Sequence, residues 1–327
     1  MDKLLMVSSS PHAKVPHTTR DIMKDVCIAL IPALLAGTYF YGLRALFVTL
    51  VSIAACVGFE WLWEKAFKKE ITIGDLSAVV TGILLAYNLP VNVPVFVIIV
   101  GAFVAIVLAK QVFGGIGQNF INPALAARAF LLSAYGTHMT SFTAPTAGQF
   151  NFTVDTITSA TPLALIKKGA VEALPSFFDV FIGNIGGCIG EASALALLIG
   201  AAYLLAKKII SWHIPAYYIG TIFVLTFVIN GFSKGFSLDV LYQSFYSLFL
   251  GGVMIGAFFM ATDYTTSPML IRGQIIFAIG AGIITTVIRL AGVYPEGVSY
   301  SILFMNLTVP LIDRYVKKRR FGGGVKA

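Results

Sequence analysis

Long runs without a charged side chain constrain the fold of this chain more than any other feature. The longest such run covers residues 76–109. Charged residues make up only 12% of the 327 residues, whereas soluble domains carry roughly 25%. This scarcity excludes an ordinary soluble enzyme, a disordered tail protein and a nucleic-acid binder of the usual kind. We predict an all-α polytopic membrane protein whose surroundings are a lipid bilayer.

Ten apolar segments are expected to form membrane helices. Pro90, Asn92 and Pro94 divide the run at 76–109 into two helices, because proline interrupts a helix. The other segments are 26–43, 45–59, 123–135, 192–206, 214–232, 240–262, 273–288 and 297–312. Several are shorter than the roughly 20 residues needed to cross a bilayer core. Snorkelling charged ends and burial among neighbouring helices accommodate such short segments.

Basic residues are distributed unevenly between the connections. With both termini cytoplasmic, 17 of the 23 Lys and Arg residues fall on the inside, five on the outside, and Arg128 within a span. This bias follows the positive-inside rule and explains the net charge of +8 without an acidic partner. The predicted regions are an N-terminal tail (1–25), a first five-helix half (26–135), an outside loop (136–190), a second five-helix half (191–315) and a basic tail (316–327).

An internal repeat is the expected origin of the two halves. Residues 77–94 align without gaps on 251–268, and 120–122 match 304–306 after a ten-residue gap. Five helices per half make the second half inverted, an arrangement typical of transport folds. The identities are few, so a chance alignment of short apolar windows stays open as the alternative.

Cysteine and histidine usage limits the metal chemistry of the chain. Cys27, Cys56 and Cys188 form no Cys-x-x-Cys pair, which disfavours a zinc or iron–sulfur site. The four histidines lie outside the long apolar spans, so a haem between two membrane histidines is not expected. We predict no metal ligands and no catalytic residue, and a redox role therefore needs another kind of cofactor.

The outside loop contains a run rich in hydroxyl groups, from Asp155 to Thr161. By the residues alone, Thr158 or Ser159 is expected to cap a short helix that begins near Pro162. Hydroxyl runs in loops usually have no further function, and this structural interpretation stands beside the functional one.

Several segments in the same order resemble one protein family. They are 74–82, 114–124, 155–161, 261–268 and 294–306. The family comprises the D subunit of the Rnf complex and the B subunit of the sodium-pumping NADH:quinone reductase. Its Asp-x-x-Ser/Thr-Gly-Ala-Thr motif ends in a threonine that a separate transferase esterifies to the phosphate of FMN. The matching residue here is Thr161, and Ser159 replaces the usual glycine.

The resemblance implies a function for the whole chain. It implies an electron-transfer subunit of a complex in the prokaryotic plasma (inner) membrane. That complex passes electrons from reduced ferredoxin to NAD and exports Na⁺ or H⁺. The resemblance also implies a covalent FMN in the outside loop and a non-covalent riboflavin in the membrane part. The implied partners are the other membrane, flavin and iron–sulfur subunits, especially a second FMN subunit, and a flavin transferase.

A glycine-rich segment precedes the fifth predicted helix. Gly115 and Gly117 allow close backbone approach to a flavin, and Asn122 and Arg128 would hold its polar groups. The alternative is a re-entrant loop in which glycine serves packing. Asn122 followed by Pro123 is also an expected cap and first turn.

Ionisable residues at membrane depth are candidates for the ion pathway. We name Asp263, Asp313 and Glu60, with capping, pairing or solvation as the alternative for each. A structural role for Arg128 would be an ion pair with Glu60 or Asp263.

The rival to an electron-transfer subunit is a stand-alone transporter or channel for a cation or small polar solute. Broken helices and an inverted repeat fit that function equally well. A cofactor-free scaffold is a third possibility. The motif that ends at Thr161 discriminates against both, because neither needs a flavin attachment site.

Overall fold

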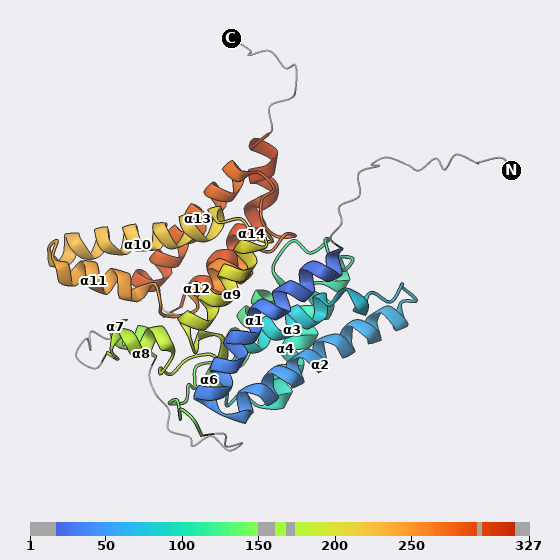
Figure 1. Cartoon of the computed structure of the whole chain (residues 1–327). Helices are drawn as coiled ribbons and strands as arrows, with labels where there is room; N and C mark the ends of the chain where they lie inside the picture. Colours follow the sequence, from blue (N-terminus) through green and yellow to red (C-terminus); the bar gives the residue numbers. More distant parts are fainter. Residues whose placement is uncertain (1–17, 150–160, 168–173, 293–295, 318–327) are drawn as a thin grey trace, which may run out of the picture.

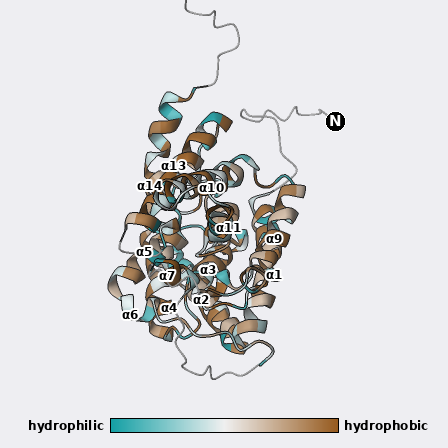
Figure 2. Ribbon diagram, turned by 90° about the vertical axis from the view of Figure 1, so that its left-hand side faces the viewer, coloured by the Kyte–Doolittle hydropathy of each residue, from teal (hydrophilic) through white to brown (hydrophobic). Residues whose placement is uncertain are grey.

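The computed structural model describes residues 18–149, 161–167, 174–292 and 296–317, and every regular element within these ranges is helical. Five stretches are long and apolar enough to cross a membrane: Thr19–Tyr41, Leu43–Ala66, Val95–Phe113, His213–Ser233 and Ile271–Ala291. Shorter apolar helices accompany them, as the sequence predicts. Figure 2 shows apolar residues along most of the ribbon.

The first helix begins within the predicted N-terminal tail (1–25), at the capping box of Thr18 and Asp21, in which the Asp21 N–H donates to the Thr18 hydroxyl over 3.3 Å. Pro90 and Pro94 lie in the connection between two helices, as predicted. Asn122 caps the helix that begins at Pro123, because its side chain accepts from the Ala124 and Leu125 N–H groups. The helices are α1 (Thr19–Tyr41), α2 (Leu43–Ala66), α3 (Ser77–Tyr87), α4 (Val95–Phe103), its π-helical extension η2 (Val104–Leu108) and α5 (Pro123–Ala134).

Three short helices lie in the predicted outside loop: α6 (Gly136–Met139), α7 (Pro162–Lys167) and α8 (Phe177–Ile182). In Figure 1, α7 and α8 lie below α11 (Leu238–Ser247). The Phe177 ring stacks on Phe245 of α11 at 5.7 Å between centroids, and the Tyr246 hydroxyl donates to the Pro175 carbonyl over 2.9 Å. The loop is therefore held against the second half by an aromatic contact and a hydrogen bond.

The second half contains α9 (Ala194–Ala206), α10 (His213–Lys234), α11, α12 (Val253–Ile255), the π-helical η6 (Gly256–Met260), α13 (Ile271–Ala291) and α14 (Val298–Tyr315). The prediction of one helix over 240–262 is wrong. The chain breaks after Ser247 because Gly251 and Gly252 adopt φ of 59° and 65°, a left-handed conformation that favours glycine. Arg289 of α13 donates to the carbonyls of Ser247, Leu250 and Gly251 and so stabilises this break.

The two halves meet along α1 and α9 and along α5 and α14. Gly200 of α9 permits the first contact, since a Cβ there would lie 1.9 Å from the Ala29 carbonyl oxygen. Small residues allow such close approach between membrane helices. In Figure 1 the start of α1 and the end of α14 point toward the top, whereas α6, α7 and α8 lie lower in the molecule.

Candidate functional site

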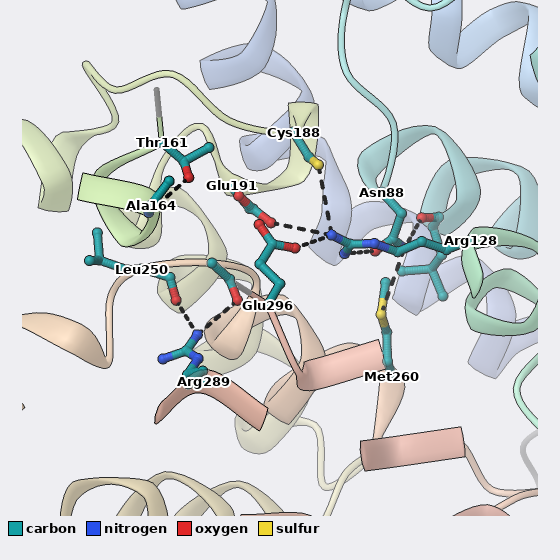
Figure 3. Close-up of polar contacts among 12 residues, drawn as sticks. Asn88, Arg128, Thr161, Ala164, Cys188, Glu191, Leu250, Met260, Arg289 and Glu296 are labelled. Atoms are coloured by element: carbon teal, nitrogen blue, oxygen red, sulfur yellow. Dashed lines mark hydrogen bonds and ion pairs between the residues drawn. The ribbon is translucent and has the colours of Figure 1, made fainter. Parts of the chain in front are cut away.

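Buried charged residues gather in two places. The arginine cluster consists of Arg128 with Asn88, Cys188, Glu191 and Glu296, and it is drawn in Figure 3. The lysine cluster consists of Lys110 with Glu60, Ser77 and Gln111.

Arg128 projects from the middle of α5 and is held by contacts from three other segments. Its Nη1 donates to the Asn88 Oδ1 over 2.7 Å, and its Nη2 forms a direct ion pair with Glu296. The same Nη2 lies 4.0 Å from the Cys188 sulfur and 4.0 Å from the Glu191 Oε1. Its side chain is only 10% exposed, so solvent screens these interactions weakly.

Two carboxylates share this one guanidinium. The side chains of Glu191 and Glu296 point toward each other beside Arg128 (Figure 3). The Glu191 Oε1 is buried and accepts no hydrogen bond from any described residue. Glu191 ends the 3₁₀ turn η5 (Ile189–Glu191), outside the membrane-spanning helices. The pKa of the Glu191 carboxyl is raised above the ordinary range. Burial is the largest cause, and the negative charge of the facing Glu296 is the second.

Thr161 stands at the start of α7, close to this cluster. Thr161 is buried, and its hydroxyl oxygen accepts a hydrogen bond from the Ala164 N–H at 3.3 Å. Leu163 and Glu296 both lie next to Gly251. A Cβ added to Gly251 would be 2.8 Å from the Leu163 Cδ2 and 3.3 Å from the Glu296 Cγ. The segment that begins at Thr161 therefore packs against the residues around the arginine cluster.

The helix near Pro162 is confirmed, since α7 begins at that residue. The capping hydrogen bond within the described part of the chain is made by Thr161 itself. Asp155, Thr158 and Ser159 lie outside the described residues, so their predicted roles stay predictions.

The lysine cluster has one acid for one base. Lys110 Nζ donates to the Glu60 Oε1 and to the Ser77 hydroxyl, each over 2.6 Å, and the Gln111 amide donates to the same Glu60 oxygen over 2.7 Å. Glu60 and Lys110 are almost fully buried. Lys110 and Glu60 are in direct contact, which favours a structural role for Glu60, and the buried Glu60 Oε2 accepts no hydrogen bond from any described residue.

A cavity of about 90 Å³ borders the lysine cluster. Asn122 and Asp263 lie on its wall, whereas Gly115 and Gly117 are not among the described residues that line it. The Asp263 carboxylate accepts from the hydroxyls of Thr265 and Thr266 over 3.0 and 3.1 Å. The polar wall residues are Ser77, Thr81, Lys110, Asn119, Asn122, Thr262, Asp263 and Thr265.

The predicted pairing of Arg128 with Glu60 or Asp263 is wrong. Arg128 pairs with Glu296 and Glu191, while Glu60 pairs with Lys110. Asn122 lines the cavity and Arg128 belongs to the arginine cluster, and their role toward a flavin stays a prediction. Asp313 lies elsewhere, on α14, with its Oδ1 buried and without a hydrogen bond among the described residues.

Arg128 is the one member of the arginine cluster that sequence reasoning names as a site residue. Sequence reasoning gives no site role to Asn88, Cys188, Glu191 or Glu296, nor to the neighbouring Arg289. The available signal was the presence of Arg128 at membrane depth, since a buried cation needs acceptors. The acceptors themselves lie far away in the sequence: Asn88 is 40 positions and Glu296 is 168 positions from Arg128.

The fold and its buried charges define a multi-pass helical membrane protein. The chain belongs to the NQR2, RnfD, RnfE family, whose model matches residues 6–322. Similar proteins include the D subunit of the Na(+)-translocating ferredoxin:NAD(+) oxidoreductase complex of Acetobacterium woodii, 53% identical over 97% of this chain and 95% of the relative. The D subunit of the proton-translocating ferredoxin:NAD(+) oxidoreductase complex of Clostridium ljungdahlii is 43% identical over 98% of this chain and 96% of the relative. The D subunit of the ion-translocating oxidoreductase complex of Shewanella amazonensis is 34% identical over 97% of each.

Proposed function

We propose that this chain is the membrane-embedded D subunit of a complex that couples electron flow from reduced ferredoxin to NAD with export of Na⁺ or H⁺. The observation that carries the proposal is the near-complete match to relatives bearing that name, at 53% and 43% identity. Ferredoxin and NAD would bind partner subunits, because this sequence offers neither clustered cysteines nor a Gly-x-Gly-x-x-Gly segment in a suitable context.

The proposal includes FMN esterified through its phosphate to Thr161. A threonine needs only its hydroxyl for this tether, and Thr161 is the last residue of the motif that begins at Asp155. The isoalloxazine ring of bound FMN supplies one- and two-electron chemistry that no side chain offers. Thr161 is the tether, and Asp155, Thr158 and Ser159 are the other flavin-binding residues of the motif.

The position of Thr161 sets a condition for its modification. Its hydroxyl is buried and engaged with the Ala164 N–H, and Lys167 at the other end of α7 donates to the Gly292 carbonyl. A transferase reaches the hydroxyl only when the start of α7 leaves this position. We therefore expect attachment before α7 packs, or during its release.

The remaining parts of the proposal concern topology and the ion path. Both termini are placed in the cytoplasm and the Thr161 loop outside, with two inverted five-helix halves. The partners are the other Rnf-type subunits, including a second FMN subunit, and a non-covalent riboflavin completes the cofactors. Asp263 is the stronger ion-path candidate because its carboxylate borders a cavity, whereas Glu60 is paired with Lys110.

A denaturing gel tests the covalent flavin directly. The full chain is co-expressed with a flavin transferase, purified, and viewed under ultraviolet light. We expect a yellow-green fluorescent band for the wild type and Thr161→Ser, and a dark band for Thr161→Val. Thr143→Val, which removes another buried threonine hydroxyl, should stay fluorescent.

A dark wild-type band beside a fluorescent reference flavoprotein would contradict covalent attachment. It would identify Ser159, in place of the usual glycine, as disabling the motif. The stand-alone transporter would then become the leading function.

A further inference from the structure

The arginine cluster contains one carboxylate more than its cation can balance. Arg128 is the only base within 4.0 Å of Glu191 or Glu296 among the described residues. The side chains of Glu191 and Glu296 are 7% and 15% exposed. Two buried carboxylates that face each other cannot both keep their charge without a large cost, and such pairs retain one proton between them.

The surroundings of Glu191 favour a proton over a metal ion. A cavity of about 10 Å³ lies beside Glu191, between Gly190 and Gly252. This volume corresponds to about one water molecule. The described residues include no group of three or more His, Cys, Asp or Glu side chains placed to hold a metal ion. The Glu191 Oε1, which accepts no hydrogen bond from any described residue, therefore has room for a proton and one water, and few oxygen ligands for a metal.

We propose that Glu191 and Glu296 form a proton-binding site in which the two carboxyl groups share one proton beside Arg128. The Arg128 guanidinium holds Glu296 by a direct ion pair and leaves Glu191, at 4.0 Å, as the more weakly compensated acid. The proton bridges the facing oxygens, and the small cavity at Glu191 has room for one water molecule with which it exchanges.

Other charged and titratable groups face this pair from several elements. Cys188 lies beside Arg128, Tyr41 of α1 contributes a buried hydroxyl that donates to the Ile185 carbonyl, and Arg289 of α13 contacts Gly251 next to Glu296. Arg289 is held by three backbone carbonyls rather than by either carboxylate. It moderates the excess negative charge without forming a second ion pair.

The location gives the site a role that rests on the proposed function. The Thr161 segment packs at Gly251, beside Glu296. Negative charge that arrives on a group tethered to Thr161 would raise the proton affinity of the pair, and departure of that charge would lower it. The proton site would then compensate charge next to the electron carrier.

Infrared spectroscopy of the purified full chain tests the site. A protonated carboxyl group gives a carbonyl band that shifts in D₂O, and we expect this band at neutral pH, well above the ordinary carboxyl pKa of about 4.3. Glu191→Gln should abolish the band while leaving the Arg128–Glu296 pair intact. Glu296→Gln should abolish it as well, because Glu191 then pairs with Arg128 as a carboxylate.

Glu60→Gln is the matched control, since Glu60 is equally buried but has its own base. It should leave the band unchanged. Absence of the band in the wild type, or its persistence in Glu191→Gln, would overturn the proposal. Loss of the band when Na⁺ replaces K⁺ at constant ionic strength would also overturn it, because the site would then hold a metal cation.

Thr161→Val separates this site from the flavin. The shared proton belongs to the chain, so the variant should keep the infrared band whatever the gel experiment shows. If the gel shows bound flavin, its chemical reduction should strengthen the band in the wild type and leave it unchanged in Thr161→Val. A reduction-insensitive wild-type band would remove the charge-compensating role and retain the proton site.

Discussion

The arginine cluster and the lysine cluster handle a buried positive charge in opposite ways. Lys110 meets one carboxylate, Glu60, at 2.6 Å, and Gln111 and Ser77 add neutral groups to this pair. Arg128 meets two carboxylates, and one of them lies at the edge of contact, at 4.0 Å. One cluster is balanced in charge, and the other carries an excess carboxylate.

This difference separates structure from function in a membrane protein where every buried charge is costly. A balanced pair with additional hydrogen bonds connects two elements, and here it holds α2 against the segment after η2. An unbalanced group has two protonation states of similar free energy, which a nearby change in charge can exchange. Sequence reasoning named Glu60 for the ion path, yet the geometry favours Glu191 and Glu296 as the groups that exchange a proton.

The largest expected effect comes from breaking the balanced pair. Lys110→Met leaves Glu60 buried without its base, and removal of one partner of a buried pair costs about 3–5 kcal/mol. Denaturant unfolding of the detergent-solubilised chain should show this loss. The double variant Lys110→Met with Glu60→Gln should recover most of it, and equal stability of Lys110→Met and the wild type would refute the structural role.

A smaller effect is expected from the neutral amides that support each cluster. Asn88→Ala removes the 2.7 Å hydrogen bond to Arg128, and Gln111→Ala removes the 2.7 Å bond to Glu60. Hydrogen bonds to charged groups contribute about 1.5–3 kcal/mol. The same unfolding experiment should give losses in this range for both variants. A loss confined to one of them would show that only that cluster depends on its amide.

The smallest effect, and the most diagnostic, is expected for Glu191→Gln. The folded state raises the pKa of Glu191, so the folded chain binds more protons than the unfolded chain once the pH exceeds the unfolded value of about 4.3. Wild-type stability therefore falls as the pH rises through this window. The variant lacks this titration, so it should match the wild type to about 1 kcal/mol at low pH and become relatively more stable at high pH.

Unfolding midpoints measured from pH 4 to pH 8 in roughly one-unit steps test whether the stability of the wild type falls as the pH rises. The series starts near the ordinary Glu pKa of about 4.3. Glu60→Gln serves as the contrast, since it leaves Lys110 without a carboxylate and should be less stable than the wild type at high pH. A parallel pH dependence for Glu191→Gln and the wild type would show that folding does not raise the proton affinity of Glu191.

The sequence by itself determined the features that depend on neighbouring residues. The scarcity of charge predicts a helical membrane protein, the two prolines at 90 and 94 separate α3 from α4, and Asn122 caps α5 as expected. Asp75 accepts from the Ser77 N–H over 2.7 Å, in keeping with a cap at the start of α3. These signals act within one or two helical turns, so no knowledge of the tertiary structure is needed to interpret them.

Only the tertiary structure decided which charges meet. Arg128 is 168 positions from Glu296, and Lys110 is 50 positions from Glu60, so neither pair leaves a local pattern. The break between α11 and α12 was missed for the same reason, because the carbonyls it frees are satisfied by Arg289, 38 or more positions away. A charged residue within an apolar segment predicts that a partner exists, but the packing of the helices determines which residue that partner is.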